Sequence, residues 1–192
     1  MPLSPLIRFG TSTWTYEGWQ CQVYLKKYAK TTFARECLGE YCQYLYNGEP
    51  LFNQDHEGEP PAAVRQFKSA ISEADAILIV TPEYNYSVPG VLKNAIDWAS
   101  RPYGQSAWDG KPVGIMGASV GMLGTARAQY HLRQIFVFLN MFPLNQPEVM
   151  IANVDQKFDT DGKLTDKKTA KKIQELLQAL GDWTRMLKKA RT

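Results

Sequence analysis

The sequence is poor in the residues that build metal centres and disulfide frameworks. Among 192 residues there are two widely separated histidines and three cysteines, none of them in a Cys-x-x-Cys pair. An odd number of cysteines without such spacing favours a reducing compartment, so we expect a cytoplasmic location and no disulfide scaffold. Two scattered histidines also lead us to expect no metal site.

Long apolar runs and a strong excess of one charge are missing as well. No apolar stretch reaches the roughly 18 residues that a membrane-spanning helix needs, and the N-terminus lacks the basic and apolar regions of a signal peptide. The net charge is only +3, with Lys and Arg dispersed along the chain. We therefore expect neither a membrane nor a nucleic acid as partner. The length suits a single domain over residues 1–192.

Apolar patterns alternate regularly from about residue 51 onward. Short continuous apolar runs predict parallel strands buried on both faces, and the segments between them have helical spacing. Such alternation predicts right-handed βαβ units around a parallel sheet, an α/β fold. The expected strands are residues 6–9, 76–80, 111–119 and 148–154; the expected helices are residues 33–45, a helix that starts at Pro60-Pro61, residues 91–100, residues 124–139, and a last helix with Thr165 as its N-cap.

The first βα unit is atypical. Some twenty residues without clear periodicity separate Gly10 from the helix expected at residues 33–45, whereas a βα connection usually takes two to six. Only residues 43–46 and 50–52 could form a second strand before the helix at Pro60. The sequence leaves open whether this edge strand exists.

The most informative motif is TPEYNYSVPGVLKNAIDWASRP at residues 81–102. It follows a buried strand, and open α/β sheets bind their ligands at the carboxyl ends of strands. A turn at that position can offer backbone hydrogen bonds to a planar heteroaromatic ring. A tight loop capped by proline and glycine, without a ligand, is the alternative interpretation.

Residues 51–192 resemble the NADPH-dependent FMN reductase family, which includes chromate- and azo-reducing flavoenzymes. The resemblance is carried by PLFNQD (50–55), by the PEYNYSVPGVLKNAIDW block and by GASVGMLGTARAQ (117–129). It implies a flavodoxin-like three-layer sandwich with FMN as cofactor and NAD(P)H as reductant. The electron acceptor would be a small molecule such as a quinone, an azo dye, a metal oxyanion or free flavin. The resemblance also implies a homodimer or a higher homo-oligomer.

The resemblance also implies which residues form the flavin site. The turn would hold the isoalloxazine ring, and the loop after the following strand would cover its other face. We expect no catalytic residue, because the flavin itself carries the chemistry. The implied ring contacts are Pro82, Glu83, Tyr84 and Asn85, and the implied residues of the opposing loop are Ser119, Gly121 and Gly124.

The start of the chain departs from that family. Residues 6–46 resemble the opening of an uncharacterised domain family with a TIM-barrel fold, which begins GTSxWxYxxW after its first strand. We therefore expect a chimera joined near residues 47–52, with residues 1–50 as a barrel-like first unit. The matching positions are Gly10, Thr11, Ser12, Trp14, Tyr16 and Trp19.

A consequence of this start concerns the FMN phosphate. The family's Ser/Arg/Asn-rich phosphate loop of the GSxRxxSxN kind is absent, and the hydroxyl groups of Thr11, Ser12 and Thr13 could replace only part of it. We expect an NAD(P)H-dependent FMN reductase with weakened FMN binding. Two alternatives stay open: a non-enzymatic fold that has lost flavin binding, and a fragment that binds another phosphate ligand through residues 10–13.

Overall fold

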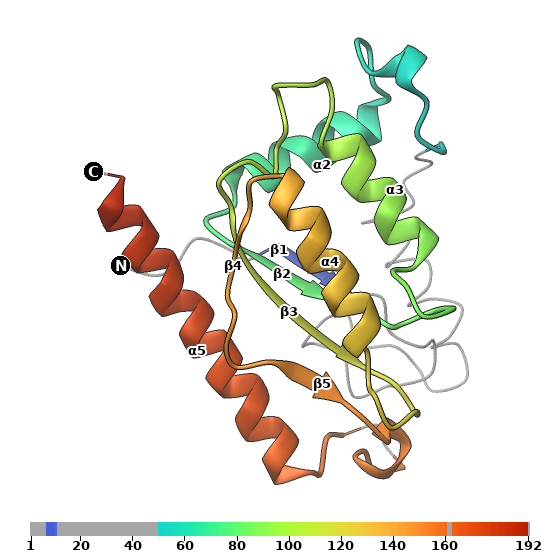
Figure 1. Ribbon diagram of the computed structural model, residues 1–192, viewed down its shortest axis with the longest axis vertical. Coiled ribbons are helices and arrows are strands. Elements are labelled where there is room, and N and C mark those ends of the chain that lie inside the picture. Colours follow the sequence, from blue (N-terminus) through green and yellow to red (C-terminus); the bar gives the residue numbers. More distant parts are fainter. Residues whose placement is uncertain (1–6, 11–49, 161–162, 192) are drawn as a thin grey trace.

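The computed structural model describes the backbone of residues 7–10 and all atoms of residues 50–160 and 163–191 (Figure 1). Within these ranges one sheet is flanked by helices, in the order expected for an α/β fold. The strands are β1 (Ile7–Gly10), β2 (Ile77–Val80), β3 (Pro112–Ala118), β4 (Phe142–Pro143) and β5 (Val149–Ile151). The helices are α2 (Ala62–Glu73), α3 (Gly90–Ala99), α4 (Ala126–Phe138) and α5 (Lys167–Ala190), with 3₁₀ turns η2 (Gln54–His56) and η3 (Val154–Gln156).

All strand pairs in this sheet are parallel. The order is β1-β2-β3-β4, and β5 also pairs with β3. Strand β4 pairs with the start of β3 and β5 with its end, so β4 and β5 occupy one position in the sheet, interrupted by residues 144–148. This is the flavodoxin-like order 2-1-3-4-5 with position 2 unfilled among the described residues.

The split of the last strand was not predicted. The sequence predicted a single strand over residues 148–154, whereas β5 ends at Ile151 and Asn153 adopts a left-handed conformation with φ of 47°. Strand β4 was missed because two residues, one of them proline, are too short to show a period.

Residues 50–52 do not form the missing edge strand. They lie as an extended coil on helix α3, where the carbonyl of Pro50 accepts a hydrogen bond from Trp98 Nε1 at 2.8 Å. The backbone N–H of Phe52 donates to Asn94 Oδ1 at 2.7 Å, and its ring packs edge-on against Trp98. The polar groups of this segment are thus satisfied by a helix instead of a strand. The other possible strand, residues 43–46, and the helix expected at residues 33–45 lie outside the described residues.

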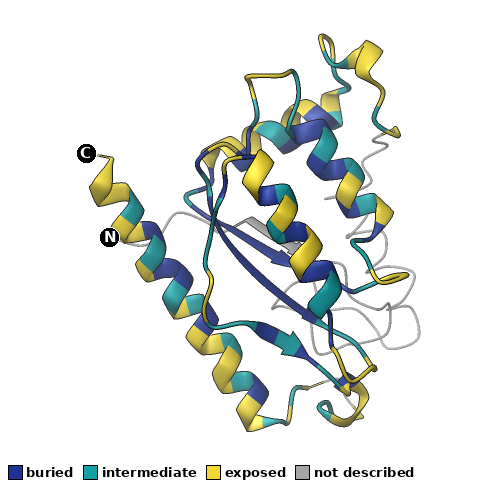
Figure 2. Cartoon of the chain, in the orientation of Figure 1, coloured by how far each residue is buried: buried dark blue, intermediate teal, exposed yellow. Residues whose placement is uncertain are grey.

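Strands β2 and β3 are buried on both faces, which is why they are continuous apolar runs in the sequence. Ile77, Ile79 and Val113 point into a core shared with α2, α3 and α4. Leu78 and Val80, at the alternate positions, point into a second core closed by α5. Figure 2 shows the buried strands between these helices, which form the two outer layers.

Helix α5 begins one residue later than expected. Thr165 was the expected N-cap, but the cap is Asp166, whose carboxylate accepts from the backbone N–H of Thr169 at 2.9 Å. Hydrogen bonds from the side chain and backbone of Thr169, assisted by Lys157, lower the pKa of Asp166. The hydroxyl of Thr165 donates instead to the carbonyl of Lys157. Both residues are good caps, so local sequence does not choose between them.

Two features of other classes of protein are absent from the described residues. No helix in these ranges has the length and apolar character needed to cross a bilayer. Even the 24-residue helix α5 carries several lysines near both of its ends. The same ranges hold no group of three or more His, Cys, Asp or Glu side chains placed to bind a metal ion.

Candidate functional site

The candidate site lies where β2 and β3 end. The loop after β2 contains the PEYN motif, and the loop after β3 leads into α4. A hydrogen bond from the N–H of Thr81 to the carbonyl of Met116, 3.1 Å long, keeps the two strand ends together. Because the strands are parallel, both loops leave the same edge of the sheet (Figure 1).

The PEYN motif forms a tight turn with an uncommon backbone. Tyr84 and Ser87 exchange two backbone hydrogen bonds, of 3.1 and 2.9 Å. Between them, Asn85 and Tyr86 have φ angles of 49° and 65°. Two left-handed residues in a row define a type I′ turn, in which asparagine suits the first position and glycine the second. A residue with a Cβ costs roughly 1–2 kcal/mol in this conformation, so Tyr86 must be held by its surroundings.

Glu83 connects this turn to the start of helix α4. Its carboxylate accepts from the backbone N–H groups of Arg127 and Ala128, at 2.9 and 3.1 Å, and its side chain is only 5% exposed. The same carboxylate pairs with the Arg127 guanidinium through Nε and Nη2, both at 2.5 Å. Glu83 therefore caps the helix N-terminus, which the side chain of the N-cap residue Thr125 leaves uncapped.

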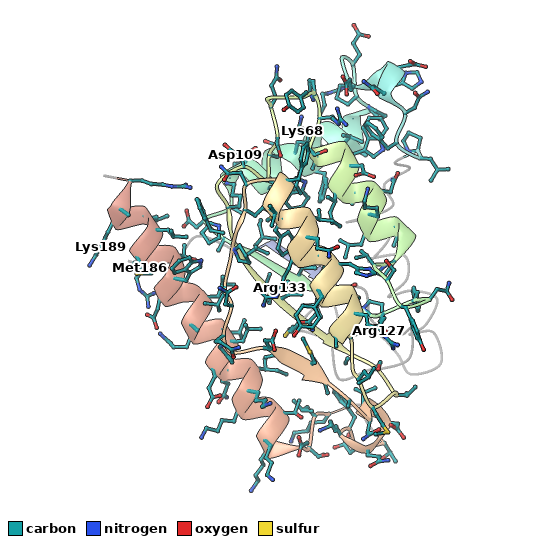
Figure 3. The ribbon with its side chains drawn as sticks, in the orientation of Figure 1. Lys68, Asp109, Arg127, Arg133, Met186 and Lys189 are labelled. Atoms are coloured by element: carbon teal, nitrogen blue, oxygen red, sulfur yellow. The ribbon has the colours of Figure 1, made fainter. Side chains whose placement is uncertain are left out.

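Arg127 completes a second contact with the turn. Its guanidinium carbon lies 3.5 Å from the centre of the Tyr86 ring, a cation–π contact. Partial burial acts to lower the pKa of Arg127, but the interactions with Glu83 and Tyr86 outweigh burial and raise it, so the side chain stays charged. Figure 3 shows Arg127 at the start of α4, beside the loop that follows β2.

His131 ties the far end of the turn to the same helix. Its Nδ1 lies 2.9 Å from the hydroxyl of Ser87, one helical turn beyond Arg127. The turn is thus held to α4 at both of its ends.

The opposing loop is ordered by its own hydrogen bonds. The Ser119 hydroxyl donates to the carbonyl of Gly124 at 2.7 Å, and the Ser119 N–H donates to the carbonyl of Ile151 at 2.9 Å. Gly124 has a φ of 58°, and a Cβ at this position would lie 3.0 Å from the backbone of Met150. The loop therefore lies close against β5, while Met122 and Leu123 face solvent.

A cavity of about 400 Å³ lies between the turn and the opposing loop. It brings together five of the residues predicted for the flavin ring site. Pro82, which is buried, and Tyr84, which is 41% exposed, do not line it. Thr11, Ser12 and Thr13 lie outside the described residues. The lining residues are Glu83, Asn85, Tyr86, Ser119, Gly121, Met122, Leu123, Gly124 and Arg127.

Sequence reasoning missed four of these lining residues. Tyr86, Met122, Leu123 and Arg127 all lie inside the quoted motifs but were not singled out. An exposed tyrosine in a turn and an arginine that opens a helix carry no signal by themselves, because their importance comes from the contact between them. Glu83 lines the cavity as well, and its carboxylate is directed to α4.

Comparison with known proteins identifies the family. The family model described as NADPH-dependent FMN reductase matches residues 23–156, more than half of the chain. The chain belongs to this family. It is an FMN-dependent NAD(P)H oxidoreductase with a flavodoxin-like fold, as the sequence predicted.

Individual relatives agree with the family model. An NAD(P)H-dependent FMN reductase of Pseudomonas aeruginosa is 57% identical over 144 residues, covering 74% of this chain and 77% of that protein. A 2-hydroxy-1,4-benzoquinone reductase of a Burkholderia species is 49% identical over 72% of this chain and 75% of its own length. Among solved structures, the flavoenzyme FerB, an NAD(P)H:(acceptor) oxidoreductase of Paracoccus denitrificans, superposes with a TM-score of 0.67 at 41% identity, covering 74% of this chain and 79% of FerB.

The comparisons also bear on the start of the chain. The family model already begins at residue 23, whereas the sequence led us to expect a barrel-derived segment up to residue 46 and a junction near residues 47–52. The two assignments overlap over residues 23–46. Nothing in the comparisons supports the barrel resemblance, and the expected junction does not coincide with the start of the family match.

The residues around the cavity fit a flavin ring. Among the described residues, the backbone N–H groups of Asn85 and Tyr86 donate to no other protein group, and the Asn85 side chain is exposed and has no hydrogen bond. Such donors suit the carbonyl oxygens and ring nitrogens of an isoalloxazine. Met122 and Leu123 offer apolar surface for its faces.

Proposed function

We propose that the two loops bind the isoalloxazine ring of FMN and that the enzyme reduces quinones. The observation that carries this proposal is the cavity at the carboxyl ends of β2 and β3, formed by the two motifs that the family shares. In this assignment Asn85 binds the edge of the ring, and Ser119, Gly121 and Gly124 form the loop that faces it. Pro82 and Tyr84 support the turn from outside the cavity.

Quinone is the acceptor class that both the relatives and the cavity favour. The Burkholderia relative is named for a benzoquinone. The cavity is open, and its rim carries the exposed apolar side chains of Tyr86, Met122 and Leu123. A flat, uncharged ring can lie against such a surface. Among the described residues, an oxyanion at this cavity would meet one cation, Arg127, which is already paired with Glu83.

The contribution of the chain to the reaction is placement. When bound, FMN would supply the two-electron redox chemistry between NAD(P)H and the acceptor. The turn orients one edge of the ring through backbone and amide donors. The opposing loop limits access of water to one side of the ring, and the open side of the cavity admits nicotinamide and acceptor in turn. Among the cavity residues we assign no general acid or base.

Steady-state kinetics test the acceptor. With FMN present, we expect kcat/KM for 1,4-benzoquinone to exceed that for chromate and for an azo dye by at least tenfold. The physical reason is the exposed apolar surface of Tyr86, Met122 and Leu123 at the cavity. NADPH oxidation followed at equal acceptor concentrations measures this. A preference for chromate or the azo dye would reject the quinone assignment.

The same preparation tests the ring site. Asn85→Ala is expected to raise the Kd for FMN about fivefold or more, since one lost hydrogen bond is worth on the order of 1 kcal/mol. Asn145→Ala is a matched control, because Asn145 is exposed and bonds only Arg133, away from the cavity. Equal affinity in the two folded variants would exclude Asn85 from the flavin site.

We also propose that the chain forms a homo-oligomer through helix α4. Tyr130, Val137 and Phe138 are 52%, 83% and 74% exposed and share one side of this helix. An apolar stripe of this kind on a surface helix is typical of an interface. The sheet adds a second reason, since β1 is the last strand on its side among the described residues.

Light scattering measures the oligomeric state. We expect at least twice the protomer mass at micromolar concentration, and a lower mass for Val137→Glu combined with Phe138→Glu. Introducing charge onto the stripe would require burying carboxylates in the interface. The mass of a single protomer for the unmodified chain would contradict the proposal. A barrel-derived origin of residues 6–46 forms no part of the proposed function.

A further inference from the structure

The turn at residues 84–87 depends on contacts outside itself. Its two central residues are left-handed, and the second of them, Tyr86, is neither glycine nor asparagine. The two backbone hydrogen bonds between Tyr84 and Ser87 close the turn but do not remove the steric cost at Tyr86. An isolated segment with this sequence would favour other turn types.

Among the described residues, the compensating contacts come from helix α4. Arg127 stacks on the ring of Tyr86. The carboxylate of Glu83 pairs with the Arg127 guanidinium and accepts hydrogen bonds from two backbone N–H groups at the start of the helix. Glu83 is nearly buried, so its carboxylate is fixed in position. The three side chains thus link the turn to the helix. Glu83, the residue before the turn, binds Arg127 on the helix, and Arg127 contacts Tyr86 within the turn.

We propose that Glu83, Arg127 and Tyr86 are positioning residues that clamp the turn onto α4 in its left-handed form. They act on the flavin through the backbone of residues 84–87, not through contact of their side chains with the ring. The inference rests on the proposed function, in which this turn binds the isoalloxazine. The clamp also explains why residue 86 is a tyrosine, although glycine adopts the left-handed conformation at lower cost.

Two substitutions of Tyr86 separate this clamp from a direct contact. Tyr86→Gly removes the ring but adopts the left-handed conformation freely, whereas Tyr86→Ala removes the ring and keeps the steric cost. We expect the Kd for FMN to rise about tenfold in Tyr86→Ala and less than threefold in Tyr86→Gly. If the ring of Tyr86 instead stacks on the flavin, both variants lose affinity equally, and the proposal fails.

Arg127 provides the second half of a double-mutant cycle. Arg127→Gln is expected to raise the Kd for FMN about tenfold when residue 86 is tyrosine and less than threefold when it is glycine. Arg127→Lys keeps the charge but loses the planar guanidinium, so it should restore only part of the affinity. Equal losses with tyrosine and with glycine would mean that Arg127 does not act through the turn. Arg185→Gln, which removes an exposed ion pair on α5, is the matched control.

Spectra distinguish positioning from general destabilisation. At saturating FMN we expect a shifted visible spectrum of the bound flavin in Arg127→Gln, because ring donors move, and an unshifted spectrum in Arg185→Gln. Unchanged spectra in folded variants with weakened binding would count against the clamp. If Arg127→Gln does not fold, the comparison of Tyr86→Gly with Tyr86→Ala still decides.

One measurement keeps this inference separate from the proposed function. Hydrogen exchange of the Tyr84 and Ser87 amides in the flavin-free full-length chain reports on the turn alone. We expect exchange at least tenfold faster in Arg127→Gln than in Arg185→Gln. If exchange is faster in Arg127→Gln but Asn85→Ala binds FMN as tightly as the unmodified chain, the clamp is supported and the turn is rejected as the flavin site. Unaltered exchange would reject the clamp whatever the flavin does.

Discussion

Replacement of Gly117 by alanine is expected to destabilise the protein and to damage the flavin site. A Cβ at this position would lie 2.2 Å from the carbonyl oxygen of Thr81 and 2.2 Å from Thr125 Oγ1. The first of these atoms belongs to the backbone just before the PEYN turn and the second to the N-cap of α4. Relief of the overlap must therefore separate the two elements that form the site. We expect a loss of about 1–3 kcal/mol in the free energy of unfolding.

Urea unfolding of the flavin-free protein measures this loss, and a flavin titration of the same variant measures the site. Gly121→Ala is the control for stability, since the nearest atom to its added Cβ is the Ser119 hydroxyl at 3.6 Å and its φ is not positive. We expect the control to unfold within about 0.5 kcal/mol of the unmodified chain. Equal stability of the two variants would show that β3 and α4 are packed less closely than the structure shows.

FMN and riboflavin are expected to bind with similar affinity, in the micromolar range or weaker. In flavodoxin-like reductases the phosphate lies at the N-terminus of the first helix, where free N–H groups and the helix dipole favour an anion. Each charge-assisted hydrogen bond to an anion is worth roughly 1.5–3 kcal/mol, and 1.4 kcal/mol is a tenfold change in affinity. An intact phosphate loop would therefore favour FMN by several orders of magnitude.

No GSxRxxSxN pattern follows the first strand in this sequence. Residues 11–13 supply threonine and serine hydroxyls instead, and the match to the family model begins only at residue 23. Titration of both flavins by fluorescence quenching measures the preference, for which we expect less than about tenfold. Reductase activity should then require added FMN. A preference of a hundredfold or more for FMN would show that the start of the chain forms a working phosphate site.

Much of the fold was predictable because burial leaves a direct trace in sequence. Strands β2 and β3 lie between two layers of helices, so they are continuous apolar runs. Where a predicted strand end differs from the structure, it differs by one residue. Helices α2, α3 and α4 begin within two residues of the predicted positions, where proline or glycine marks the turn. Strand β4 was missed because two residues carry no period.

The α/β class, the parallel sheet and the two loops at the cavity could be inferred from local patterns, because apolar period and turn residues are local signals. Three contacts are visible only in the folded protein: Glu83 is directed to α4, Arg127 stacks on Tyr86, and residues 50–52 pack as coil on α3. Each of these contacts joins residues more than forty positions apart. Its energy depends on geometry that exists only once both elements are in place, so no local pattern predicts it.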